Sequence, residues 1–254
     1  MSNKSKERAF EIIKYYVDQI SKLPFIKSII LDGSLSDDTY TGNKGSDIDI
    51  VNVIESNNYY EDKLYLLKLI EDIENFTNKD IPISKVVYNY SQLFHPYDYN
   101  FDVNKTNKDL IELPIEVLRI KYSGKTLYGE DIISVIDQPT KEDVLYCKEL
   151  NQQLLMKQAS ENPKGYSSYL EIIKNPPMSI LCQIVITTAM EDYFLVLGKN
   201  CSSKRKILEC IEKDWPQYEK IELLRICRKY RVNNSLSKEE EILSNKLYRE
   251  LFVL

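Results

Sequence analysis

The chain has 254 residues and a formal net charge of −5, with charged residues making up 29% of it. That length is enough for one large domain or two small ones with a buried core. The acidic balance argues against a protein that tracks a nucleic-acid backbone, since such proteins carry a basic stripe, and favours a small or cationic substrate. No apolar run reaches eighteen residues and no signal-like run follows the N-terminus, so no membrane partner is expected. With five scattered cysteines and no C-x-x-C pair, we expect a cytoplasmic protein with reduced thiols.

The N-terminal part alternates between helical and strand-like patterns. Apolar residues recur at three-to-four spacing over 7–23 and 60–76, which predicts two amphipathic helices. Three short β-prone runs predict strands over 25–31, 47–54 and 81–88. The polar, glycine-bearing segment between the first two strands is expected to hold a turn and a short helix or loop. This alternation predicts an α+β domain in which helices flank a mixed sheet.

After about residue 110 the pattern becomes helical throughout. Six helices are predicted over 110–122, 141–160, 177–197, 204–213, 215–230 and 238–252. Residues 137–140, Asp-Gln-Pro-Thr, have the composition of a linker followed by a helix N-cap. We therefore predict a mixed domain over 1–109 and an all-helical C-terminal domain over 110–254.

The most informative pattern joins the first two predicted strands. Leu-Asp-Gly-Ser at 31–34 closes the first strand, and Ser-Asp-Ile-Asp-Ile at 46–50 opens the second. Because strand side chains alternate between faces, Asp47 and Asp49 share one face. Two adjacent carboxylates repel each other unless a cation lies between them. Mg²⁺ prefers such hard oxygen ligands, often together with substrate phosphates. Asp47 and Asp49 are therefore the candidate metal ligands.

Gly33 and Ser34 have the properties of a phosphate site. Glycine lets the backbone approach a ligand closely, and the serine hydroxyl and the free N–H groups of a helix start favour a phosphate. The plain alternative is a surface turn followed by a strand with two solvated aspartates. Each half of the pattern is common alone, but the combination favours metal-assisted phosphoryl-type chemistry, which depends mainly on positioning and charge neutralisation.

This combination resembles the signature of the nucleotidyltransferase superfamily typified by DNA polymerase beta: an apolar residue, Gly, Gly or Ser, a spacer, then Asp-apolar-Asp. Further segments resemble, in order, those of the bacterial enzymes that adenylylate streptomycin and spectinomycin. These are a Pro-aromatic segment, an aromatic-Gly turn, a Gly-Lys…Ser-Lys stretch and a Pro-x-Tyr segment, at 94–99, 124–131, 198–204 and 215–218. The matches run from about residue 26 to 231; the first is specific at superfamily level, and the others only together.

The resemblance implies transfer of AMP from ATP to a hydroxyl of an aminoglycoside-like small molecule, with Mg²⁺ as cofactor. It implies that 1–109 is the catalytic nucleotidyltransferase domain and that 110–254 closes over the nucleotide and shapes the acceptor pocket. Gly33, Ser34 and Ser46 would then cradle phosphate, and Lys204 would contact the phosphates of ATP.

The chain departs from this family at the third predicted strand. The related enzymes carry a glutamate there that takes the proton of the attacking hydroxyl, whereas this chain has Pro82. Asp80 is the nearest carboxylate in sequence and our candidate substitute; other carboxylates that could serve are Asp98, Asp102 and Glu112. The missing glutamate leaves room for a protein-modifying or antitoxin-type nucleotidyltransferase that AMPylates a partner protein. A third alternative is a non-catalytic domain that binds nucleotide.

Overall fold

The chain forms two compact units, Met1–Thr140 and Lys141–Leu254. The computed structural model describes residues 2–37, 40, 42, 47–95, 97, 113–162, 164, 174–201, 203–233 and 235–252. Ser46, Asp98, Asp102 and Glu112 lie outside the described residues.

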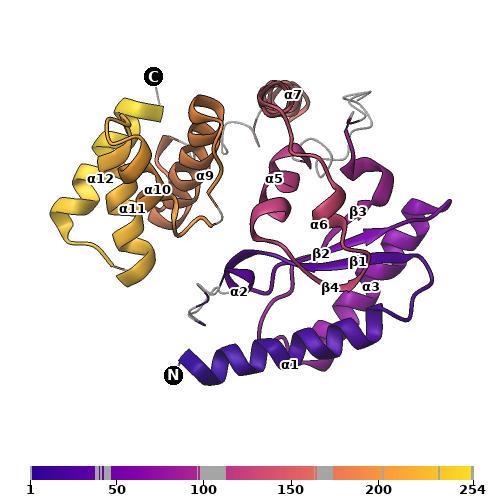
Figure 1. Cartoon of the computed structure of the whole chain (residues 1–254). Coiled ribbons are helices and arrows are strands. Elements are labelled where there is room, and N and C mark those ends of the chain that lie inside the picture. The colour runs from indigo at the N-terminus through magenta and orange to yellow at the C-terminus, as the bar shows by residue number, and fades with distance from the viewer. Residues whose placement is uncertain are drawn as a thin grey trace. The chain divides into compact units, whose positions relative to one another are not determined.

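The first unit is built on a four-stranded sheet with the strand order β3-β2-β1-β4 (Figure 1). Strand β1 (Ile26–Leu31) lies antiparallel to both β2 (Ile50–Ile54) and β4 (Lys125–Gly129). Strand β2 lies parallel to β3 (Val86–Asn89). The predicted α+β class with a mixed sheet is confirmed.

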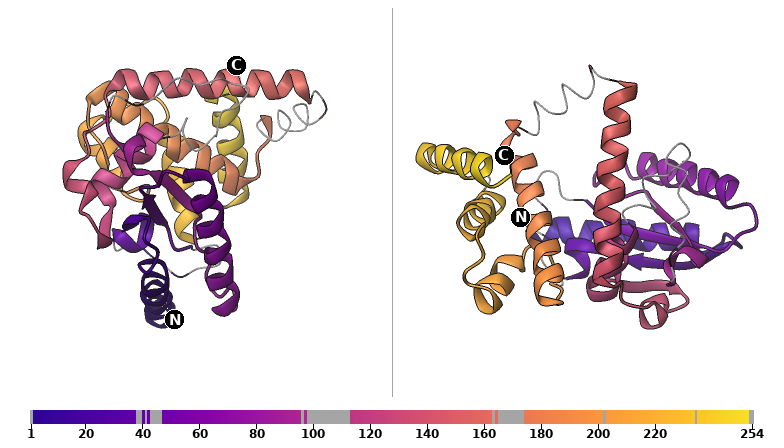
Figure 2. Two further views of the ribbon diagram at one scale, coloured as in Figure 1. Left: turned by 90° about the vertical axis from the view of Figure 1, so that its right-hand side faces the viewer. Right: turned by 90° about the horizontal axis from the view of Figure 1, so that it is seen from above.

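Helices cover both faces of this sheet (Figures 1 and 2). Helices α1 (Ser2–Ile20) and α3 (Tyr59–Phe76) share one core cluster with strand residues such as Ile29. Helices α5 (Leu113–Ser123) and α6 (Ile132–Val135) share another with residues such as Ile30. Because β1 and β2 are covered on both faces, apolar residues occupy both faces of each strand, interrupted by Lys27, Ser28 and Asn52. Two short helices, α2 (Gly33–Ser36) and η1 (Tyr90–Leu93), follow β1 and β3.

Strand β4, which the sequence patterns did not predict, ties the segment after α5 to the sheet. Gly129 at its end has φ 82°, and an added Cβ would lie 2.2 Å from the Lys27 carbonyl oxygen, so glycine permits the close approach to β1. The compact units therefore divide between Thr140 and Lys141, and the predicted domain boundary after residue 109 lies inside the first unit. The difference arises because α5, β4 and α6 pack with the sheet.

The described part of the second unit is helical. Its longer helices are α7 (Lys141–Glu161), α9 (Met178–Leu197), α10 (Ile207–Asp214), α11 (Ile221–Asn233) and α12 (Lys238–Phe252). Helix α7 is long and straight (Figure 2). Helices α9 to α12 enclose a core with buried residues from each, including Leu181, Ile211, Leu223 and Tyr248. All five cysteines of the chain are free thiols.

Among the described helices, α9 alone is long and apolar enough to cross a membrane, with a mean hydropathy of 1.6. Several of its residues are buried in the core of the second unit. It also carries Glu191, which pairs with Lys148 at 2.7 Å, and Asp192, which pairs with Lys220 at 3.3 Å. Burial and ion pairing of this kind identify α9 as the core helix of this unit.

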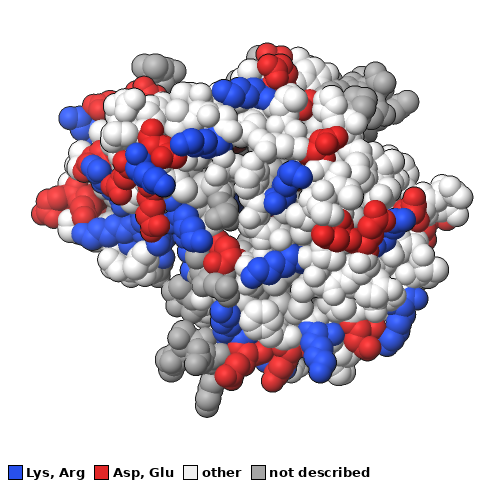
Figure 3. Space-filling model, viewed as in Figure 1, with Lys and Arg blue, Asp and Glu red and all other residues white. Residues whose placement is uncertain are grey.

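Charged side chains of both signs are mixed on the face shown in Figure 3. Along α1, for example, Arg8 pairs with Glu11 at 3.0 Å and Lys22 pairs with Asp18 at 2.9 Å. This mixed pattern is that of a solvated surface.

Candidate active site

The candidate site lies where β1 ends and β2 begins. The register places Leu31 opposite Ile50, and the backbone N–H of Asp32 donates to the carbonyl oxygen of Asp49 at 2.9 Å, which extends the antiparallel pairing by one residue. The chain then turns at Gly33 into α2. The two halves of the sequence motif are therefore brought together by the pairing of β1 with β2.

Gly33 lies directly against the carboxylate of Asp49. A Cβ added at Gly33 would lie 2.0 Å from Asp49 Oδ2 and 2.8 Å from its Cγ. The φ of Gly33 is 65°, in the left-handed region that side chains with a Cβ rarely adopt. Glycine is thus required twice here, by its backbone conformation and by the carboxylate beside it. The sequence predicted a close approach of phosphate to Gly33, and the structure shows a close approach of Asp49.

Asp47 and Asp49 flank Ile48, which is fully buried and forms an isolated parallel bridge with Ile83. Ile48 and Ile50 belong to the core on the α1 and α3 side. Because side chains alternate along an extended chain, the two aspartates point toward the opposite side, which α5 covers. Asp47 is exposed and Asp49 half-buried. The predicted shared face of the two carboxylates is therefore consistent with the burial pattern.

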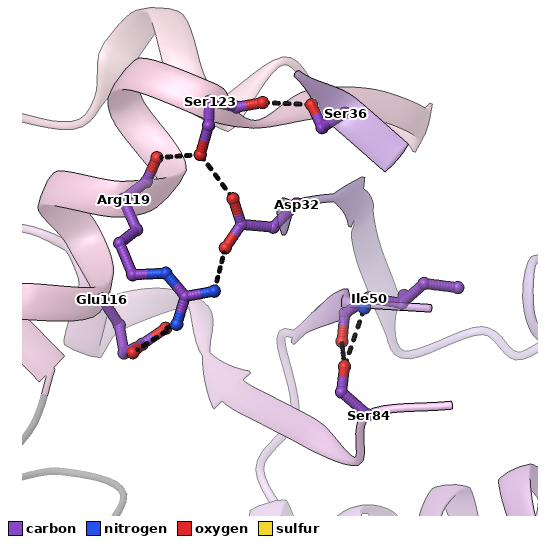
Figure 4. Close-up of polar contacts among 7 residues, drawn as sticks. All are labelled: Asp32, Ser36, Ile50, Ser84, Glu116, Arg119 and Ser123. Carbon is purple, nitrogen blue, oxygen red and sulfur yellow. Dashed lines mark hydrogen bonds and ion pairs between the residues drawn. The ribbon is translucent and has the colours of Figure 1, made fainter. Parts of the chain in front are cut away.

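Ser84 precedes strand β3. By extension of the parallel β2–β3 register, it lies beside Asp49. The backbone N–H of Ile50 donates to Ser84 Oγ at 2.8 Å, and this hydroxyl donates to the Ile50 carbonyl oxygen at 3.1 Å (Figure 4). Pro82 is exposed, and its carbonyl oxygen accepts from the N–H of Ile48 at 2.8 Å. Ser84 thus holds the backbone just after Asp49, and Pro82 supplies no side-chain oxygen.

A partly buried charge network lies at the end of β1, around Asp32 (Figure 4). Asp32 is 1% exposed, and its Oδ2 accepts from Arg119 Nη2 of α5 at 2.7 Å. Arg119 Nη1 also donates to both oxygens of Glu116, at 2.8 and 3.0 Å. The Ser123 hydroxyl donates to Asp32 Oδ1 at 2.5 Å. Burial by itself lowers the pKa of Arg119, but attraction to Glu116, Asp32 and Asp49 raises it overall, so this side chain remains a cation.

Sequence reasoning did not assign Asp32 or Arg119 to the site. The available signal was an aspartate at the end of a buried apolar strand, directly before Gly33. Such a carboxylate needs a partner when it is buried. Its partner comes from a helix 87 positions later, so spacing in the sequence did not identify it.

The other predicted site residues have different surroundings. Ser34 is half-buried in α2. Asp80 lies between α3 and Ile83 and pairs with Arg8 of α1, whose Nη2 is 3.0 Å from Asp80 Oδ2. Helix α1 covers the sheet face opposite to the one toward which Asp49 points. Lys204 is half-buried in the turn before α10, in the second unit. The roles of Asp80 and Lys204 stay predictions.

The donor set of the site suits one kind of metal. Among the described residues, no group of three or more His, Cys, Asp or Glu side chains is placed to hold an ion. Two neighbouring carboxylates fit Mg²⁺, which binds through one or two protein carboxylates while substrate phosphates and water complete its coordination. Asp47 and Asp49 are the residues that would hold it.

No family model and no curated protein sequence matches the chain. Among solved structures, it is similar to spectinomycin adenyltransferase AAD(9) from Enterococcus faecialis with ATP and spectinomycin, with 14% identity and a TM-score of 0.52. The match covers 99% of this chain and 99% of that one. The chain has the fold of this adenyltransferase.

Two toxin–antitoxin structures also match, one with AMP-PNP and one of an MntA–HpeT mutant. Both have 15% identity and a TM-score of 0.26. Each match covers 60% of this chain, and the two cover 92% and 91% of the matched chains. Similarity at this level carries no argument about function.

Proposed function

We propose that this protein is a Mg²⁺-dependent nucleotidyltransferase that transfers AMP from ATP to a hydroxyl of a small molecule of the aminoglycoside type. The observation that carries the proposal is the contact between Gly33 and Asp49. It unites the glycine-serine turn with the Asp47–Asp49 pair in a fold shared with an adenyltransferase. ATP and the acceptor are the proposed partners.

In the proposed reaction, the acceptor hydroxyl oxygen forms a bond to the α-phosphorus of ATP. The bond between that phosphorus and the bridging oxygen breaks, pyrophosphate leaves, and the hydroxyl proton passes to a base. Gly33 and Ser34 lie at the end of β1, where backbone N–H groups and a hydroxyl suit a phosphate. Mg²⁺ held by Asp47 and Asp49 would neutralise charge on the phosphates.

Asp80 is the proposed base because it is the carboxylate nearest in sequence to the third strand, and Asp98, Asp102 and Glu112 are the other candidates. To act as the base, Asp80 would have to leave its ion pair with Arg8 on the α1 side of the sheet. Asp80→Asn should abolish AMP transfer while ATP binding is retained. If turnover persists, the base is instead one of the three carboxylates in 98–112, and the corresponding single substitutions identify it.

The test is incubation of the protein with ATP, Mg²⁺ and a panel of aminoglycosides and aminocyclitols, with mass spectrometry of the products. We expect an AMP adduct on at least one acceptor and stoichiometric pyrophosphate. Asp49→Asn should lose nearly all turnover while its circular dichroism stays that of the wild type. ATP binding without transfer to any member of the panel would refute the acceptor class. In that case, AMP found on a co-expressed protein would support protein AMPylation, and absence of transfer to any acceptor would support nucleotide binding alone.

A further inference from the structure

Asp32 and Asp49 are opposite neighbours on antiparallel strands. This register follows from two observations. Leu31 pairs with Ile50, and the backbone N–H of Asp32 donates to the carbonyl oxygen of Asp49. Side chains of directly opposed residues lie on the same face of a sheet, with Cβ atoms about 5 Å apart. Two carboxylates therefore lie side by side at this point. One is the candidate metal ligand, and the other is 1% exposed.

Arg119 is the cation that these carboxylates share. Its guanidinium contacts Asp32 at 2.7 Å and Glu116 at 2.8 Å, and it is also attracted by the charge of Asp49. The Ser123 hydroxyl fixes the second oxygen of Asp32, and Ser36 of α2 donates its hydroxyl to the Ser123 carbonyl (Figure 4). Asp32 is thus anchored at both oxygens, in an orientation that directs it to the arginine.

Stability alone does not account for this arrangement. A buried ion pair contributes little net stability, because the cost of removing both charges from water offsets their attraction. Asp32 is also poorly placed as a metal ligand, because it is 1% exposed and its contact with the Arg119 cation, at 2.7 Å, would repel a second cation. What the Asp32–Arg119 ion pair does determine is the position of the Arg119 positive charge relative to Asp49.

We infer that Asp32 is a positioning residue that holds the guanidinium of Arg119 on its own carboxylate and so limits the competition of Arg119 with a divalent cation for Asp49. This inference rests on the proposed function, in which Asp49 is a metal ligand. When Asp32 loses its charge, Asp49 becomes the stronger attractor for the guanidinium, and an ion pair between them competes with the metal. Groups that orient metal ligands from outside the coordination shell typically change metal affinity by about 10- to 100-fold.

The experiment measures Mn²⁺ binding to the full chain by electron paramagnetic resonance, which reports free Mn²⁺ without any need for turnover. Asp32→Asn keeps the size of the side chain, removes its charge and replaces one acceptor oxygen with an N–H donor. It should weaken Mn²⁺ binding by about 10- to 100-fold. Adding Arg119→Met in the same chain removes the competing cation and should restore most of the wild-type affinity. Glu55→Gln, which removes an ion pair with Lys27 elsewhere on the β1–β2 hairpin (3.0 Å), is the matched control and should leave affinity unchanged.

The outcomes separate this inference from the proposed function. If the wild type binds Mn²⁺ and Asp49→Asn does not, the metal site stands; unchanged binding by Asp32→Asn then overturns the positioning role alone. A double variant that binds no better than Asp32→Asn also overturns it, since a merely structural defect would not be rescued by a second substitution in the same network. If the wild type does not bind Mn²⁺, the metal site and the positioning role both fail. Thermal unfolding of each variant confirms that the folded protein is being compared.

Discussion

Replacing Gly33 with alanine tests whether the turn and the Asp49 carboxylate act as one unit. The added Cβ would lie 2.0 Å from Asp49 Oδ2, whereas ordinary contacts begin at 3.4 Å, so the carboxylate must move by about 1.4 Å. A misplacement of about 1 Å at a reacting centre costs on the order of 100-fold in rate. The left-handed backbone adds a stability cost of about 1–2 kcal/mol for a residue with a Cβ.

Gly198 provides the matched control. Its φ is 66°, but a Cβ there would meet only Lys141 Cε at 3.7 Å, an ordinary contact. Gly198→Ala should therefore lower the free energy of unfolding by a similar amount, about 1–2 kcal/mol in urea titrations, and leave the rate of AMP transfer unchanged. The assay is the rate of AMP transfer at saturating ATP and Mg²⁺. Equal rates for the two variants would refute the reasoning, because backbone strain alone would then account for the effect of Gly33→Ala.

Two other variants test the surroundings and the pH dependence. Ser84→Ala leaves the N–H of Ile50 without its acceptor and should lower the free energy of unfolding by about 1–3 kcal/mol in urea titrations; an unchanged midpoint would contradict the role of this hydroxyl. Burial first, and then the nearby Asp143 carboxylate, raises the pKa of the Cys147 thiol from 9.0 to about 12. The folded state therefore keeps a proton that the unfolded state loses, so this stabilisation is complete below the unfolded pKa and is lost as the pH rises toward 12. Between about pH 8 and about pH 10, the wild type should lose about 1.4 kcal/mol more stability than Cys147→Ala, and equal losses would contradict the shift.

Periodicity was sufficient to predict most elements that have an apolar face. The two helices that flank one side of the sheet, the two central strands and most of the C-terminal helices lie close to their predicted positions. The third strand is shorter than predicted. The run 81–88 suggested a strand from its start, but Pro82 and Ser84 interrupt regular pairing, so β3 begins at Val86. A side-chain hydroxyl that replaces a backbone partner has no periodic signature.

Edge pairing and the charge network could not be predicted in the same way. Residues 125–129 form an edge strand that is largely exposed or half-buried, so they lack the apolar run that identified the central strands. The closeness of Gly33 and Asp49 was predictable because both residues lie in one local motif. Asp32 was visible in that motif, but its role depends on Arg119, which reaches it only through packing of α5 on the sheet.

The most direct test of the proposed reaction is a crystal structure of the full chain with a non-hydrolysable ATP analogue and Mg²⁺. The proposal predicts that oxygens of Asp47 and Asp49 coordinate Mg²⁺ at about 2.1 Å and that the same ion contacts the triphosphate beside Gly33 and Ser34. A triphosphate bound elsewhere, or a Mg²⁺ ion without Asp49 in its coordination shell, would contradict it.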